Sequence, residues 1–273
     1  MSHIDFIPLI LILVIVTLAL IGSIEIGFRY GYAVQGGAKK TQMAQVRAIM
    51  GASLGLLAFM LAFSFSIAQS HFEERSKAYM TEVSAIDTAF RGADLLPAKY
   101  RTEAKELLIH FARLRIETTE AVSSSEADAV IEMIRESELM HDQLWSIAER
   151  SMEGAGRGED TGIFVQAVLA MINAHDARLQ AALFNRISPV IWITLVLMAV
   201  LSMAVMGYQA GLTGTRSTLA TWTLAITFSA VMMLVTDLDR PNMTLFKLNQ
   251  DLMEELGNRM QESMSFVPQD LQD

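Results

Sequence analysis

Four long stretches without a charged residue constrain this chain more than any other feature. They cover residues 6–24, 48–70, 187–215 and 217–236, and contain 19, 23, 29 and 20 residues. A helix needs about 20 consecutive apolar residues to cross the hydrocarbon core of a bilayer. The sequence therefore predicts an all-α integral membrane protein with four transmembrane helices, rather than a soluble protein with four buried helices. The first stretch is expected to remain as an anchor, because no basic region precedes it and no small-residue cleavage site follows it.

Between the second and third spans the sequence predicts an extramembrane, antiparallel bundle of four helices. The helix of the second span continues into this bundle, because residues 56–91 contain no Gly or Pro and form about 54 Å of helix. Gly92 is expected to end that helix in a left-handed turn, and Pro97 to occupy the first turn of the next one. The predicted domains are 1–70 (two spans and a basic loop), 71–187 (the bundle), 188–240 (two spans) and 241–273 (an acidic tail).

The charges are unevenly distributed along the chain, whose net charge is −9. In the loops after the first and third spans, every charged residue is basic; these residues are Arg29, Lys39, Lys40, Arg47 and Arg216. The long inter-span segment and the tail are both acidic. Because basic loops stay in the cytoplasm, this distribution predicts a multi-pass protein of the inner (plasma) membrane with an extracytoplasmic bundle.

Four blocks of sequence resemble the bestrophin-like domain family. They are EIGFRYG after the first span, the block from GLLAFMLAFSFSIAQS to GADLLP, INAHDARLQAA before the third span, and DLDRP after the fourth. The family name reflects a distant likeness to bestrophins, which are oligomeric anion channels. That resemblance implies a homo-oligomer whose second span lines a pore, with cytoplasmic inter-span helices. The charge distribution predicts the opposite side for those helices.

Aromatic and aliphatic residues recur along the second span. Phe59, Phe63 and Ile67 are spaced by four residues, so they share one face of a helix. Around an oligomer axis this face would form a hydrophobic constriction that gates by dewetting. Packing against neighbouring spans or lipid is the alternative. Ser64 and Ser66 add polarity, although serine in a membrane helix commonly bonds its own backbone or packs closely.

Two charged residues, Glu25 and Arg29, lie one turn apart at the end of the first span. Ionisable residues within a membrane are rare and often functional. At the interface, however, an i,i+4 ion pair that extends toward water explains them more simply.

A second charged group is predicted where the second and fourth spans end on one membrane face. Its members are His71, Glu73, Glu74, Asp237, Asp239 and Arg240. In a closed oligomer the acids would form rings that favour cations. The alternative is a helix-terminating element, completed by Pro241, that ties the tail to the bundle.

Three histidines, His110, His141 and His175, fall near the middle of successive bundle helices and would lie at similar heights after antiparallel packing. A metal site or a pH-sensing layer would use them. However, a di-iron bundle needs two Glu-x-x-His motifs, and only Glu138 with His141 provides one. Solvated or hydrogen-bonded histidines are therefore the preferred interpretation, and no metal or other cofactor is predicted.

The sequence contains no phosphate loop, dinucleotide fingerprint, nucleophile elbow or HExxH motif, and no cysteine. It also lacks the basic stripe of a nucleic-acid-binding protein. The chain is therefore not expected to be an enzyme or to bind nucleic acid. Its expected partners are the lipid bilayer, further copies of itself and ions. Two hypotheses remain: an oligomeric ion channel lined by span two, and a non-conducting sensor or scaffold whose acidic bundle binds a partner or cation.

Overall fold

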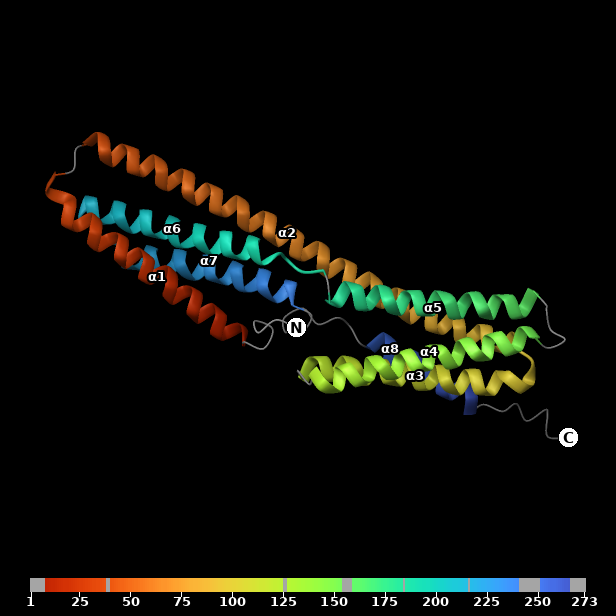
Figure 1. Cartoon of the computed structure of the whole chain (residues 1–273). Coiled ribbons are helices and arrows are strands. Elements are labelled where there is room, and N and C mark those ends of the chain that lie inside the picture. The colour runs from red at the N-terminus through yellow and green to blue at the C-terminus, as the bar shows by residue number, and fades with distance from the viewer. Residues whose placement is uncertain are drawn as a thin grey trace. The chain divides into compact units, whose positions relative to one another are not determined.

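The computed structural model describes residues 8–37, 40–124, 127–153, 159–183, 185–215, 217–240 and 251–265. Every regular element in these ranges is a helix (Figure 1). Four are long and apolar enough to cross a membrane: α1 (Leu9–Val34), α2 (Lys40–Gly92), α6 (Pro189–Thr213) and α7 (Thr218–Asp239). The prediction of an all-α protein with four membrane-spanning helices is confirmed. Lys39, Arg216 and Pro241 lie outside the described residues.

The chain forms two compact units. The first combines Met1–Phe72 with Arg186–Phe246, and the second combines Glu73–Asn185 with Lys247–Asp273. The helix α2 runs without interruption through 53 residues and contributes to both. The predicted continuation of the second span into the bundle is therefore confirmed.

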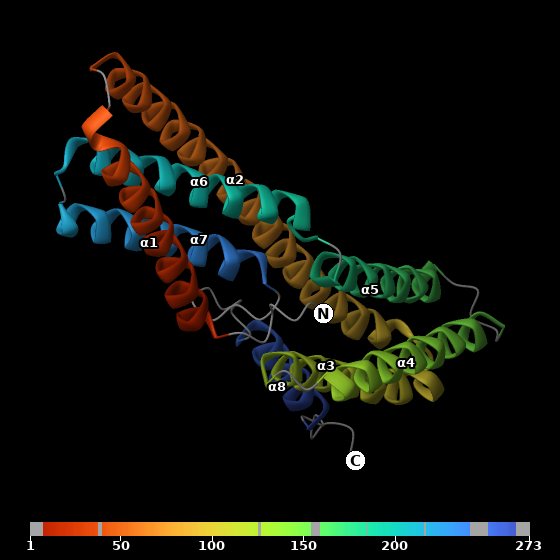
Figure 2. The ribbon, with the colours of Figure 1, turned by 60° about the vertical axis from the view of Figure 1, so that its left-hand side comes forward.

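In the first unit, α1 and α6 pack closely and cross at an angle while running in the same direction, with α7 beside them (Figure 2). Glycines make this approach possible, because a Cβ on Gly27 would collide with the backbone of Ala204, and one on Gly207 with that of Ile24. This is the close packing that small residues four apart allow between membrane helices. Ser23 Oγ also donates a hydrogen bond to the carbonyl oxygen of Val200 across the same contact, at 2.6 Å.

The core of the first unit is apolar and uses all four spans. Its fully buried members include Leu20, Leu57, Leu195 and Ala225. Many other aliphatic side chains of these helices point outward, as the hydrocarbon of a bilayer requires.

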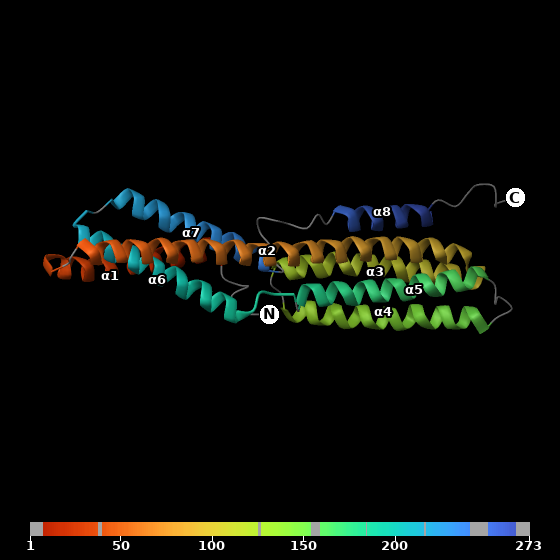
Figure 3. The same ribbon diagram turned by 90° about the horizontal axis from the view of Figure 1, so that it is seen from above.

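In the second unit, the distal part of α2 packs with α3 (Ala98–Ser124), α4 (Ala127–Glu153) and α5 (Glu159–Leu183) in a helical bundle (Figure 3). An apolar stripe runs along this part of α2, since Tyr79, Ile86 and Phe90 are buried. The left-handed turn predicted at Gly92 is wrong. Gly92 has a φ of −61°, because the chain turns instead through a short 3₁₀ segment, η3 (Ala93–Leu95).

A further helix, α8 (Asp251–Ser265), forms within the segment that the sequence analysis treats as a tail. Met253, Leu256 and Met260 lie on one face of α8 and are buried in the bundle core. Opposite Gly257 of α8, Ile116 of α3 lies within van der Waals reach. The second unit is thus a bundle with a fifth helix supplied by the C-terminal part of the chain.

Candidate functional site

The aromatic residues predicted on span two lie on the outward face of α2. Phe59 is 64% exposed and Phe63 51%, whereas Leu57 and Leu61 on the other side of the helix are buried. Ser66 is exposed, but Ser64 is buried and faces the unit's interior. Ser64 therefore does not share the face of Phe59 and Phe63.

Ile67 lies at the edge of that outward face. It is half-buried and packs against the small cluster of Ala68, Ile187, Val235 and Leu238. The reason is geometric, since each step of four residues advances about 40° around a helix. The outward face of α2 is therefore narrower than the three-residue pattern suggested.

The charged residues at the span ends have separate environments. Glu25 Oε1 and Arg29 Nε form the expected i,i+4 ion pair, at 2.9 Å. Asp239 is buried and accepts a hydrogen bond from the backbone N–H of Ile187 at 2.8 Å, with His71 Nδ1 at 3.8 Å. Asp239 thereby joins the ends of the second and fourth spans to the start of the third.

The remaining members of this group divide by exposure. Asp237 and Arg240 are buried, whereas Glu73 and Glu74 are exposed. Glu74 Oε2 accepts a hydrogen bond from Asn185 Nδ2 at 2.6 Å. Among the four acids of this group, only Glu73 and Glu74 are exposed to solvent.

A buried group of charged and polar side chains lies in the core of the bundle, and α2, α3, α4 and α5 all contribute to it. It consists of Glu82 (α2), Arg115 (α3), His141 (α4), and His175 and Arg178 (α5), and is called the Glu82 cluster below. Apart from Arg178, which is partly buried, every member is almost fully inaccessible to solvent.

Glu82 is the centre of this cluster. Its Oε1 lies 3.1 Å from Arg115 Nε and 3.0 Å from His175 Nδ1, and its Oε2 accepts a hydrogen bond from Arg178 Nη1. Burial without partners strongly disfavours a carboxylate. Here two guanidinium groups compensate for the lost hydration, so Glu82 is ionised and links α2 to both α3 and α5.

Burial also lowers the pKa values of two surrounding groups, Arg115 and His141. It lowers the pKa of Arg115 to about 10, an effect that Glu82 opposes, so Arg115 remains a cation at neutral pH. Burial, together with the neighbouring His175, lowers the pKa of His141 to about 4. His141 is therefore neutral at pH 7.

Aromatic contacts extend the cluster in two directions. The rings of Phe111, His141 and His175 pack together, with a centroid distance of 4.8 Å between the two histidines. Arg178 lies over the ring of Tyr79 at 4.9 Å, and Tyr79 Oη accepts a hydrogen bond from the backbone N–H of Met253 at 3.2 Å. The first turn of α8 is thereby connected to the cluster.

The three histidines do not form one layer. His141 and His175 meet in the core, but His110 is 57% exposed and its Nε2 lies 3.9 Å from a Glu136 carboxylate oxygen. No group of three or more potential metal ligands occurs among the described residues. The two arginines of the Glu82 cluster would also repel a metal cation.

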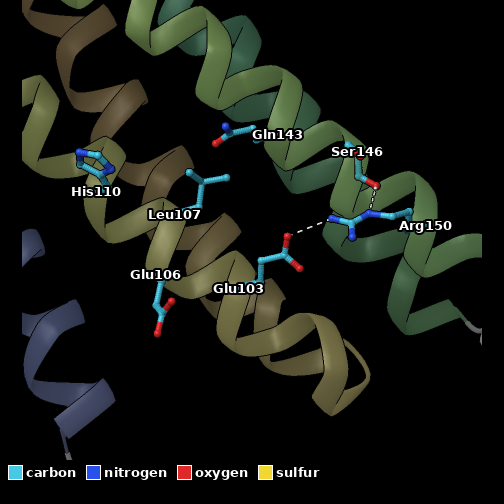
Figure 4. A pocket seen from close by; sticks show the side chains of 7 residues that line it. All are labelled: Glu103, Glu106, Leu107, His110, Gln143, Ser146 and Arg150. Carbon is cyan, nitrogen blue, oxygen red and sulfur yellow. Dashed lines mark hydrogen bonds and ion pairs between the residues drawn. The ribbon is translucent and has the colours of Figure 1, made fainter.

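His110 instead borders an open groove of about 500 Å³ between α3 and α4 (Figure 4). Glu103 and Arg150 pair across it at 3.0 Å, and Arg150 Nε also donates to the backbone carbonyl of Ser146. Glu106 points away from α4 in this view. The groove has neither a buried charge nor a convergent set of polar atoms, so the Glu82 cluster is the stronger candidate site.

Sequence reasoning missed Glu82, Arg115 and Arg178, although one signal was present. Glu82 falls between Tyr79 and Ile86 on the apolar stripe of α2, where a charge requires a buried partner. His175 and Arg178 lie in the INAHDARLQAA block. The cluster therefore joins two sequence blocks that are about 90 residues apart.

Comparison with known proteins identifies one matching protein family. The family described as Bestrophin-like domain matches residues 15–242. That match includes both blocks that meet at Glu82, most of the first helix able to span a membrane and all of the other three. No curated protein and no solved structure matched the chain.

Proposed function

Because the chain belongs to the bestrophin-like family, we propose that it is an oligomeric, channel-like permeation protein in which α2 lines the ion path. The observation that carries this proposal is the outward position of Phe59 and Phe63. A scaffold that used these rings for packing within one protomer would bury them. The proposed function involves no enzymatic activity and no cofactor.

Small residues on the same face support close approach by another copy. Gly51 and Gly55 are exposed, and a Cβ built on either would meet no atom within 4 Å. Ala58 and Ala62 extend this exposed surface toward Phe63. Small residues let membrane helices pack closely, whereas contact with lipid alone does not require them.

In an oligomer assembled through this face, Phe59 and Phe63 would narrow the path. Apolar rings close a pore to ions by excluding water rather than by filling the space completely. Shortening one ring would therefore favour wetting and raise conductance.

The acids at the span ends suggest which ions pass. Asp237 and Asp239 are buried within the protomer, so Glu73 and Glu74 are the better candidates for an acidic ring. Acidic rings favour cations, whereas the likeness to bestrophins favours anions.

We propose an inner or plasma membrane location with the bundle outside the cytoplasm, as the basic loops indicate.

Flux through purified protein in liposomes tests the proposal, with K⁺ and Cl⁻ measured separately. We expect Phe63→Ala to increase the flux of the permeant ion several-fold. Phe65→Ala is the matched control, because Phe65 lies on the same helix but about 200° around it from Phe63. Equal increases in both variants would reject Phe63 as the constriction. Absence of flux in all variants, with reconstitution verified, would favour the non-conducting sensor or scaffold.

A further inference from the structure

The two buried histidines of the Glu82 cluster have an unusual hydrogen-bonding state. A carboxylate only accepts hydrogen bonds, so His175 donates from Nδ1, which faces Glu82. The Nε2 atoms of His175 and His141 are both buried, and neither has a hydrogen-bond partner among the described residues. Two adjacent imidazoles are thus enclosed in the core with unused nitrogen atoms.

We propose that the His141–His175 pair takes up a proton at His141 and loosens the bundle when the surrounding solution becomes acidic. The inference concerns the bundle itself and does not require that the protein conducts ions. It assigns a regulatory role to a cluster that the proposed ion path does not use.

The charges facing the pair explain the expected direction. Besides its histidines, the cluster contains one anion, Glu82, and two cations, Arg115 and Arg178. Protonation of His141 would add a further cation beside a single carboxylate in a buried site. Asp176 is the other acid near His141, but it is exposed and offers only a screened attraction. Tyr79 is a further titratable side chain in contact with the cluster.

The contacts also indicate which helix moves. Ion pairs through Glu82 hold α2, α3 and α5 together, whereas His141 of α4 touches the cluster through ring packing against Phe111 and His175. Among the described residues, no hydrogen bond or ion pair joins His141 to the cluster. We therefore expect α4 to separate from α2 when the pair is protonated.

The size of the effect follows from the difference in proton affinity. Burial lowers the pKa of His141 to about 4, whereas a solvated histidine has a pKa of about 6.5. A loosened state that hydrates His141 takes up its proton first as the pH falls. Between pH 8 and pH 5, this histidine alone should raise the ratio of loosened to closed bundle about 30-fold.

The experiment is a distance measurement between spin labels on the full-length protein in liposomes, at pH 8 and pH 5. The chain contains no cysteine, so Ser84→Cys on α2 and Ser146→Cys on α4 place one label on each helix at exposed positions. We expect a population with a longer α2–α4 distance at pH 5. In the His141→Gln/His175→Gln background this population should be lost, because Gln can hydrogen-bond but does not titrate.

His110→Gln is the matched control, since it removes an exposed histidine from the same bundle and should leave the pH response unchanged. If the double variant has altered distances at pH 8, the single variant His141→Gln is used instead. In that variant, the change in the ratio of loosened to closed bundle between pH 8 and pH 5 should be about 30-fold smaller than in wild type. The proposal is overturned if the wild-type distances do not change between pH 8 and pH 5. It is equally overturned if the deciding histidine variant responds as strongly as wild type.

Discussion

At the scale of single residues, Glu82 is the carboxylate on which the buried ion pairs of the bundle core converge. Removing its charge leaves Arg115 and Arg178 without their carboxylate partner in a buried site, which is more destabilising than never having had the pair. We expect Glu82→Gln to lower the free energy of unfolding by about 3–5 kcal/mol. Denaturant unfolding of the purified protein, followed by circular dichroism, measures this change.

Glu132→Gln on α4 is the control for Glu82→Gln. Glu132 also pairs with an arginine, Arg135, but both side chains are about two-thirds exposed. An exposed pair of this kind contributes roughly 0–1 kcal/mol. Similar losses in the two variants would show that burial does not make the Glu82 cluster special.

His141 makes stability depend on pH. Its pKa is lower in the folded protein, about 4, than in an unfolded chain, about 6.5, so the unfolded chain binds the proton first as the pH falls. The stability associated with neutral His141 is complete above pH 6.5 and is lost progressively down to about pH 4. The loss should reach about 3 kcal/mol, and His141→Gln should remove it.

Denaturant unfolding at several pH values between 7.5 and 4.5 tests this dependence. Other carboxylates titrate near the lower end of the range, so the informative quantity is the difference between wild type and His141→Gln. His110→Gln should follow the wild-type curve, because His110 is exposed. A difference curve that is flat with pH would contradict the prediction.

At the scale of helices, glycines occur both in the close contact of α1 with α6 and on the exposed face of α2. Gly207 of α6 meets the backbone of Ile24, whose carbonyl carbon would lie 2.8 Å from an added Cβ, whereas Gly55 of α2 faces open space. We expect Gly207→Leu to prevent correct packing of α1 against α6 and to lower the thermal midpoint strongly. Gly55→Leu should leave that midpoint of the protomer unchanged and reduce the oligomer fraction.

Native mass spectrometry together with thermal unfolding distinguishes these effects of the two glycine variants. An unchanged oligomer in Gly55→Leu would argue against assembly through the outward face of α2. Tolerance of Gly207→Leu, with a normal thermal midpoint, would contradict the close α1–α6 packing.

The helices were predictable because their signals are local and repeated. Each membrane helix requires an uncharged run, and the distal part of α2 shows its buried stripe directly in the spacing of Tyr79, Ile86 and Phe90. The helix α8 was missed because only three of its fifteen residues are buried. Such a short amphipathic segment in an acidic tail is weakly distinguished from a solvated one.

The candidate site was less predictable because it depends on contacts between distant segments. The sequence identified His141 and His175 but grouped them with His110, because all three fall at a similar level along the bundle axis. Which face of each helix points into the core was not known from the sequence. In the structure His110 faces solvent, and the other two histidines contact Phe111 in the core. The same limitation applied to Ser64, which follows Phe63 in sequence but lies about 100° around α2 from it and is buried.

At the scale of the whole molecule, α2 connects the two proposed functions. It carries Phe63 in one compact unit and Glu82 in the other, and residues 56–91 contain no Gly or Pro that would allow a kink between them. In the proposed mechanism, a rearrangement at the Glu82 cluster would therefore act on the helix that carries the proposed constriction.

The orientation in the membrane decides which solution this core would sense, and the absence of cysteine allows a direct test. Thr88→Cys places an exposed thiol on the bundle part of α2, and Gln45→Cys places one near the basic loop. Because basic loops are retained in the cytoplasm, we expect a membrane-impermeant maleimide to label Thr88→Cys in intact cells and Gln45→Cys only after permeabilisation. The opposite labelling would place the bundle in the cytoplasm, as in the bestrophin arrangement. The proposed pair would then respond to cytoplasmic pH, whereas the expected labelling makes it a sensor of acidity outside the cytoplasm.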